Sequence, residues 1–155
     1  MLQIEIPGRE TLELRHLVLD YNGTIAVDGQ ILEALRERLR TLSHLLEIHV
    51  LTADTYGTVA RQCDGLPLTV RTFPRAEAGV CKAEIVRGLE GGVVCLGNGY
   101  NDIPMFGLAD LAIAVLMEEG ICAGLLAHAH VLVTAAEDAL DLLLYPDRLR
   151  ATLRS

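Results

Sequence analysis

The feature of this sequence that most constrains its fold is a series of short apolar runs separated by longer amphipathic segments. The apolar runs are typical of buried strands and cover residues 17–20, 48–52, 68–70, 93–97, 111–115 and 131–133. The segments between and after them predict helices over residues 28–46, 54–62, 76–89, 101–106, 120–127 and 135–144. Strands that alternate with helices form a parallel sheet joined by crossover connections. The sequence therefore predicts an α/β fold with a three-layer, Rossmann-like, mostly parallel sheet.

The N-terminal segment follows a different, alternating pattern. Two isoleucines alternate with polar residues before Pro7-Gly8, and residues 11–14 alternate again. This pattern predicts a hairpin at an edge of the main sheet. No linker rich in Pro, Gly or Ser divides the chain, so residues 1–155 are predicted to form a single domain.

Composition narrows the class of protein further. Hydrophobic residues make up 51% of the chain and aromatic residues only 4%, so the core must be aliphatic, which suits strands covered by helices on both faces. The net charge of −8 argues against a nucleic-acid partner, but it allows a phosphate substrate because a divalent cation can supply positive charge locally. No apolar stretch reaches the roughly 18 residues of a membrane span, and no signal region is recognisable at the N-terminus. The sequence therefore favours a cytoplasmic protein without a membrane partner.

Cysteines and histidines show no metal-binding pattern along the chain. The cysteines have no Cys-x-x-Cys spacing and are expected to be reduced, mostly buried thiols; they are Cys63, Cys81, Cys95 and Cys122. His128 and His130 alternate near the last strand, but no Cys, Asp or Glu joins them at ligand spacing, and we also weighed His44 and His49. The sequence therefore predicts no second metal site.

Asp20 is the first candidate functional residue. It ends the apolar run that begins at Leu17, and the chain turns directly afterwards at Asn22-Gly23. Ligands of open α/β sheets bind at the carboxyl ends of the strands. A carboxylate in this position can act as a nucleophile, as a metal ligand or as both. The alternative is that Asp20 only caps the turn.

Three further motifs follow strands or begin helices. Thr52 ends the second strand, where its hydroxyl can bind a phosphoryl oxygen or cap the next helix. Lys82 is the only lysine of the chain and can either neutralise a phosphoryl group or lie on the solvated surface. A loop with two glycines, at residues 97–102, follows the fourth strand, and its Asp102 can be an N-cap or a metal-site carboxylate.

Together these motifs resemble those of the haloacid dehalogenase-like (HAD) superfamily of aspartate-nucleophile phosphohydrolases, in the same order. The matching motifs are Asp20-Tyr21-Asn22-Gly23-Thr24, Thr52, Lys82 and Gly97-Asn98-Gly99-Tyr100-Asn101-Asp102. The resemblance extends from Leu17 to about Val133. In detail the motifs are most similar to the phosphorylation domain of P-type ATPases, in particular to small soluble P-type ATPase-like proteins.

The resemblance implies a role for each residue. Asp20 would attack a phosphate ester and form an aspartyl-phosphate, and Thr52 and Lys82 would hold the phosphoryl oxygens. The implied catalytic residues are Asp20, Asn22, Thr52 and Lys82. The implied substrate-binding residues are Gly23, Thr24, Ala53 and Asn101. The implied Mg²⁺ ligands are Asp20, Asn22 (through its backbone carbonyl), Asn98 and Asp102.

Two positions depart from the superfamily pattern, and both exchange a carboxylate for an amide. Hydrolases of the superfamily usually have an Asp where Asn22 stands, which protonates the leaving group and activates water. An amide cannot do this, because it has no titrating proton. Asn98 replaces a usual Mg²⁺-binding Asp, so the metal affinity is expected to fall. Both departures predict a slow phosphatase, an altered metal site or a loss of catalysis.

The segments between the motifs are too short for the cap domain that many members of the superfamily carry. Without a cap, the site is open to large phosphoesters as well as small phosphorylated molecules, or it is covered by a second copy in a homo-oligomer. The sequence thus favours a Mg²⁺-dependent phosphatase. The alternatives are a domain of the same fold that binds a phosphorylated ligand or protein without catalysis, and a phospho-accepting signalling domain.

Overall fold

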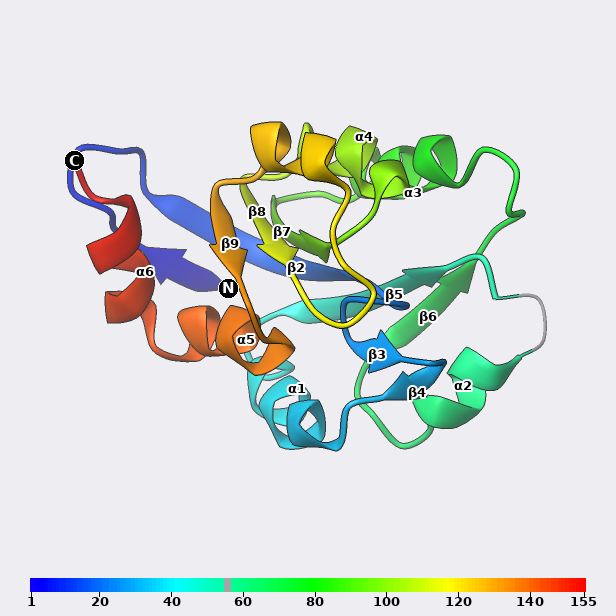
Figure 1. Ribbon diagram of the computed structural model, residues 1–155. Helices are drawn as coiled ribbons and strands as arrows, with labels where there is room; N and C mark the ends of the chain where they lie inside the picture. The colour runs from blue at the N-terminus through cyan, green and yellow to red at the C-terminus, as the bar shows by residue number, and fades with distance from the viewer. Residues whose placement is uncertain (55–56) are drawn as a thin grey trace.

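The computed structural model describes residues 1–54 and 57–155 and contains a seven-stranded sheet (Figure 1). Six strands are parallel, in the order β6-β5-β2-β7-β8-β9, and β1 pairs antiparallel with β2. The strands are β1 (Leu2–Ile4), β2 (Leu12–Asp20), β5 (Glu47–Thr52), β6 (Thr69–Thr72), β7 (Gly92–Gly97), β8 (Leu111–Val115) and β9 (Val131–Val133). The predicted α/β, mostly parallel fold is confirmed.

Helices cover both faces of this sheet, as Figure 1 shows. On one face lie η1 (Glu33–Leu35), α1 (Arg36–Leu42), α2 (Thr58–Gln62), α5 (Ala136–Leu144) and α6 (Pro146–Leu153). On the other lie α3 (Ala78–Arg87), η2 (Tyr100–Asp102), α4 (Ile103–Phe106) and η3 (Ala123–His128). Side chains of β2 alternate between the two cores, since Leu17 and Leu19 pack on the first face and Val18 on the second. Three layers result.

The N-terminal hairpin forms, but it does not lie at an edge of the sheet. β2 pairs with β1 through its first residues, where Leu2 is opposite Leu14. The same strand continues to Asp20 and pairs with β5 and β7 through its second half. The edge prediction was wrong because the alternating segment and the apolar run form one long strand.

Asp28-Gly29 is a turn and not the start of a helix. It connects β3 (Ala26–Val27) to β4 (Gln30–Ile31), with φ angles of 51° and 80°. Two left-handed residues of the type Asp-Gly are the strongest short-range hairpin signal. The helical segment therefore begins later than predicted, at Glu33.

The helix predicted over residues 76–89 exists as α3, but it buries a different face. One side of this helix carries the apolar residues Cys81, Ile85 and Leu89, and each of them is only half-buried. The residues on the buried face include Lys82 and Val86. An apolar pattern cannot select this face, because its central residue is a charged lysine that points toward the site.

The bounds of the remaining helices differ less from those predicted. The helix predicted over residues 54–62 includes positions 55–56, which lie outside the described residues; its described part is α2. The segment predicted as a helix over residues 120–127 is the 3-10 helix η3, and α6 follows the helix predicted to be last. The four cysteines are free thiols, two of them buried and two half-buried.

The connections between the strands hold no inserted domain in the part of the chain that the structure describes. Only β3, β4, η1 and α1 lie between β2 and β5, and only α2 is described between β5 and β6. The fold is therefore capless. No described helix is long and apolar enough to cross a membrane.

Candidate active site

The carboxyl ends of the parallel strands bring the predicted residues together. β2 ends at Asp20, β5 at Thr52 and β7 at Gly97, and neighbouring parallel strands end at the same edge of the sheet. A cavity of about 180 Å³ opens at this edge. It is lined by Asp20, Asn22, Thr52, Ala53, Phe73, Ala78, Lys82, Asn98, Gly99 and Asn101.

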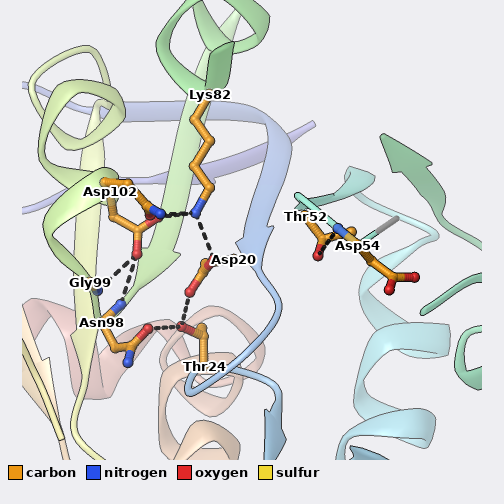
Figure 2. Close-up of polar contacts among 9 residues, drawn as sticks. Asp20, Thr24, Thr52, Asp54, Lys82, Asn98, Gly99 and Asp102 are labelled. Atoms are coloured by element: carbon orange, nitrogen blue, oxygen red, sulfur yellow. Dashed lines mark hydrogen bonds and ion pairs between the residues drawn. The ribbon is translucent and has the colours of Figure 1, made fainter. Parts of the chain in front are cut away.

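Lys82 is the centre of a buried polar cluster at this cavity (Figure 2). Its Nζ lies 2.7 Å from Asp20 Oδ1 and 2.7 Å from Asp102 Oδ1. It also donates to Asn101 Oδ1 at 2.8 Å. The lysine is 2% exposed, so its three protons are directed at three protein oxygens and not at bulk water.

The charges of this cluster are coupled. Burial, and after it the Asp102 carboxylate, raise the pKa of Asp20 to about 7, while Lys82 works in the opposite direction. Burial lowers the pKa of Lys82, but the carboxylates of Asp20 and Asp102 outweigh it and the net shift is upward. Lys82 therefore carries its positive charge at neutral pH. It can offset the charge of a carboxylate or of a phosphoryl group that enters the cavity.

Asp102 holds the loop that follows β7. Its Oδ2 accepts hydrogen bonds from the backbone N–H groups of Asn98 at 3.1 Å and Gly99 at 3.0 Å, while Oδ1 binds Lys82. The side chain is fully buried. A Cβ at Gly97 would lie 2.5 Å from Oδ2, so this close approach requires glycine. Both oxygens of Asp102 are thus engaged by protein donors.

Thr24 connects the ends of β2 and β7. Its hydroxyl lies 3.1 Å from Asp20 Oδ2 and 3.3 Å from Asn98 Oδ1, as Figure 2 shows. The amide nitrogen of Asn98 donates to the carbonyl of Gly120 at 3.2 Å, which turns the amide oxygen toward Thr24. Two oxygen ligands, one of them a carboxylate, therefore face the same small region. Mg²⁺ prefers oxygen ligands and commonly uses one or two carboxylates, so the donor set fits this ion.

Thr52 lies across the cavity from this cluster. Its Oγ1 accepts a hydrogen bond from the backbone N–H of Asp54 at 3.2 Å, which leaves the hydroxyl proton for a ligand. The Asp54 carboxylate accepts from the backbone N–H of Val59 at 3.0 Å and from the hydroxyl of Thr58. These contacts join Asp54 to the first turn of α2, whose N-cap residue is Gly57.

Not every predicted site residue lines the cavity. Gly23, Thr24 and Asp102 are not among the lining residues. The sequence did not point to Phe73 or Ala78; Phe73 directly follows β6, so the rule of strand ends could have found it. A second hollow of about 130 Å³ shares Asn22, Thr52 and Ala53 with the first and adds Arg75.

Gly23 offers a matched test of this geometry. Gly23 and Gly29 share a φ of 80°. A Cβ added at Gly23 would lie 2.3 Å from Asn98 Nδ2, whereas a Cβ added at Gly29 would have no neighbouring atom within 4 Å. In both alanine variants the free energy of unfolding is expected to fall by about 1–2 kcal/mol, because a residue with a Cβ is strained in the left-handed conformation. Only Gly23→Ala should also displace Asn98, so its loss of unfolding free energy should be the larger of the two. Urea unfolding compares the two variants, and equal losses would contradict the assigned contact.

Comparison with solved structures identifies the fold, which is that of the HAD superfamily hydrolases. The 3-deoxy-D-manno-octulosonate 8-phosphate phosphatase from Moraxella catarrhalis, solved with magnesium, phosphate and KDO, superimposes with a TM-score of 0.71 at 14% identity, over 91% of this chain and 94% of that one. The cobalt-bound enzyme from Haemophilus influenzae superimposes with a TM-score of 0.71 at 10% identity, over 92% of this chain and 94% of that one. Phosphoserine phosphatase from T. onnurineus superimposes with a TM-score of 0.61 at 16% identity, over 86% of this chain and 96% of that one.

The chain belongs to the same family as two proteins of Methanocaldococcus jannaschii, the uncharacterized proteins MJ0072 and MJ0073. It is 54% identical to MJ0072 over 39 residues, which are 25% of this chain and 89% of that protein. It is 40% identical to MJ0073 over 62 residues, which are 40% of this chain and 67% of that protein. No protein-family model matches the sequence.

Proposed function

We propose that the protein is a Mg²⁺-dependent phosphohydrolase that acts through an aspartyl-phosphate on Asp20. The observation that carries this proposal is the contact of 2.7 Å between Asp20 Oδ1 and Lys82 Nζ in a cavity at the carboxyl edge of the sheet. A carboxylate and a buried lysine are the groups that phosphoryl transfer needs, because this reaction depends mainly on positioning and charge neutralisation. The HAD hydrolase fold supports the same reaction.

In the first step, an oxygen of Asp20 bonds to phosphorus while the bond from phosphorus to the ester oxygen breaks, and the ester oxygen leaves as an alcohol or phenol after it takes a proton from water. Lys82 exchanges one of its three protein acceptors for a phosphoryl oxygen and offsets the phosphoryl charge, and the Thr52 hydroxyl donates to another phosphoryl oxygen. In the second step, water attacks phosphorus, the Asp20 carboxylate leaves, and inorganic phosphate is released. The substrate-binding roles of Gly23, Thr24, Ala53 and Asn101 remain predictions from the resemblance.

The residues that would hold Mg²⁺ are Asp20, through Oδ2, and Asn98, through its amide oxygen, together with the backbone carbonyl of Asn22. The ion would add positive charge next to the transferring phosphoryl group. The sequence also suggested Asp102 as a ligand. Because both oxygens of Asp102 accept from protein donors, we infer that this residue positions Lys82 and the loop after β7 and does not bind the metal.

A non-catalytic role is the second candidate, and Asn22 is the observation that favours it. Asn22 lines the cavity where the superfamily usually has its general acid, and Asn98 supplies a neutral oxygen instead of a carboxylate. A domain with these features could bind a phosphorylated ligand or protein, or hold a long-lived phosphoryl group on Asp20. The resemblance to soluble P-type ATPase-like proteins predicts the latter form.

The proposed substrate is a phosphorylated small molecule or a larger phosphoester. The capless cavity is open to both, and Arg75 in the adjoining hollow suits a leaving group that carries negative charge. The M. catarrhalis neighbour was solved with phosphate and a sugar acid, which supports a phosphorylated sugar as a first compound to screen. A cytoplasmic location and a homo-oligomer that covers the open site remain predictions.

The proposal is tested by phosphate release from an aryl phosphate at increasing Mg²⁺, followed by a chelator in excess over the metal. We expect turnover that saturates with Mg²⁺ and stops when the chelator is added, because the site otherwise holds one lysine against two carboxylates. Binding of inorganic phosphate without turnover at any Mg²⁺ concentration would favour the non-catalytic role instead.

A further inference from the structure

A second polar cluster lies at the opposite end of the sheet from the cavity. His16 is in β2, and Glu47 and His49 are in β5. In the register of these parallel strands His16 is opposite Glu47 and Val18 is opposite His49. Because side chains alternate along a strand, the side chains of His16, Glu47 and His49 project from the same face of the sheet. Asp20 ends β2 four residues after His16, at the other edge.

The spacing of the three side chains is that of ligands around one small metal ion. His16 Nδ1 lies 3.2 Å from His49 Nε2 and 3.6 Å from a carboxylate oxygen of Glu47. One ligand atom from each residue falls within 4.8 Å of the others. With zinc–ligand bonds of about 2.0–2.1 Å, tetrahedral coordination places ligand atoms about 3.3 Å apart.

Hydrogen bonding prepares His16 to act as a ligand. Its Nε2 lies 2.9 Å from the backbone carbonyl of Glu90, which can only accept a hydrogen bond. In the neutral ring, Nε2 therefore carries the proton and Nδ1 has a free lone pair. Metal-binding histidines commonly donate their other ring N–H to a carbonyl or carboxylate in this manner, because this fixes the tautomer and the ring orientation.

Burial and charge also suit a divalent cation. His16 and His49 are 7% and 4% exposed, whereas the Glu47 side chain is 77% exposed. Glu47 thus offers a negative charge and a route from solvent. Arg71 of β6 is an exposed cation, and its charge opposes that of a bound metal ion.

We propose that His16, Glu47 and His49 form a metal site of the zinc type, with two imidazole nitrogens, one carboxylate and a water. The site joins β2 to β5 at the amino-terminal edge of the sheet, away from the catalytic cavity. Nitrogen ligands favour zinc and related transition metals over Mg²⁺, so the two sites bind different ions. A direct hydrogen bond between the two histidines would give the same contact between their rings. The experiment must therefore distinguish this hydrogen bond from metal coordination.

The test is a titration of the untagged, metal-free protein with Zn²⁺ by calorimetry, in excess Mg²⁺. Co²⁺ absorption reports the coordination geometry in parallel. We expect one Zn²⁺ per chain and tetrahedral Co²⁺ bands. Glu47→Gln and His49→Gln should each weaken binding by at least about 10-fold. The matched control His44→Gln changes an exposed histidine of a neighbouring turn and should bind as the wild type does.

Glu47→Gln decides the test, because its exposed side chain can be changed without disturbing the core. The wild type should melt at a higher temperature with Zn²⁺ than without it, since a ligand of the folded state stabilises that state. This increase should shrink in Glu47→Gln. Zn²⁺ affinity and melting behaviour equal to the wild type in both Glu47→Gln and His49→Gln would overturn the proposal. So would the absence of stoichiometric binding to the wild type, which would leave a hydrogen-bonded histidine pair.

Discussion

Replacing Asp20 with Asn is expected to lower Mg²⁺-dependent phosphate release by at least about 10³-fold, as removal of a catalytic nucleophile does. The amide oxygen can still accept from Lys82 in place of Oδ1, and the amide nitrogen in place of Oδ2 can donate to the Thr24 hydroxyl, so the local hydrogen bonds can be kept. What disappears is the negative charge that attacks phosphorus and binds the metal. The measurement is steady-state phosphate release from an aryl phosphate, with folding checked by circular dichroism.

Asp110→Asn is the matched control. Asp110 accepts a hydrogen bond from the backbone N–H of Val93 at 2.8 Å, near the amino end of β7, and an amide oxygen can replace it there. Like Asp20→Asn, this variant removes one negative charge from the chain, but the charge that it removes lies outside the cavity. It should therefore keep wild-type turnover. Metal-dependent turnover that survives in Asp20→Asn would show that another group attacks the substrate.

Replacing Asn22 with Asp is expected to raise the rate of turnover by about 10²–10⁴-fold, the usual contribution of a positioned general acid and base. Asn22 lines the cavity beside Asp20, but its amide cannot give a proton to the leaving oxygen or take one from water. A carboxyl group can do both. The measurement is kcat across pH, where the variant should also acquire the dependence of a titrating acid.

Two controls accompany Asn22→Asp. The double variant with Asp20→Asn should be inactive, because the acid and base act only on the reaction of Asp20. Asn101→Asp introduces the same group elsewhere in the cavity, next to Lys82, and should not reproduce the gain. A rate unchanged by Asn22→Asp would contradict the placement of residue 22 beside the leaving group.

The sequence predicts those parts of the fold that depend on local patterns. The run from Leu111 to Val115 is a strand with the predicted bounds, because an apolar segment between turn signals has few alternatives. The start of the first helix was wrong because Asp28-Gly29 can either precede a helix or form a hairpin, and only the pairing of β3 with β4 selects the hairpin.

The site shows the same limit. Strand ends and motif order predict Asp20, Thr52 and Lys82, and these three do line one cavity. The sequence cannot show that Asp102 uses both oxygens on protein donors, since this depends on how the loop after β7 returns toward α3. His16 and His49 are also too far apart in sequence to indicate a cluster, because only the register of β2 with β5 brings them together.

The central claim is that Asp20 becomes covalently phosphorylated, and mass spectrometry of the acid-quenched reaction tests it most directly. Wild-type protein incubated with Mg²⁺ and an aryl phosphate is quenched and digested. Because Asn22 slows the attack by water, the account predicts that the phosphoryl group accumulates on the peptide that contains Asp20 and is released by hydroxylamine. Turnover with no phosphoryl group on that peptide, or with the group on another residue, would contradict the account.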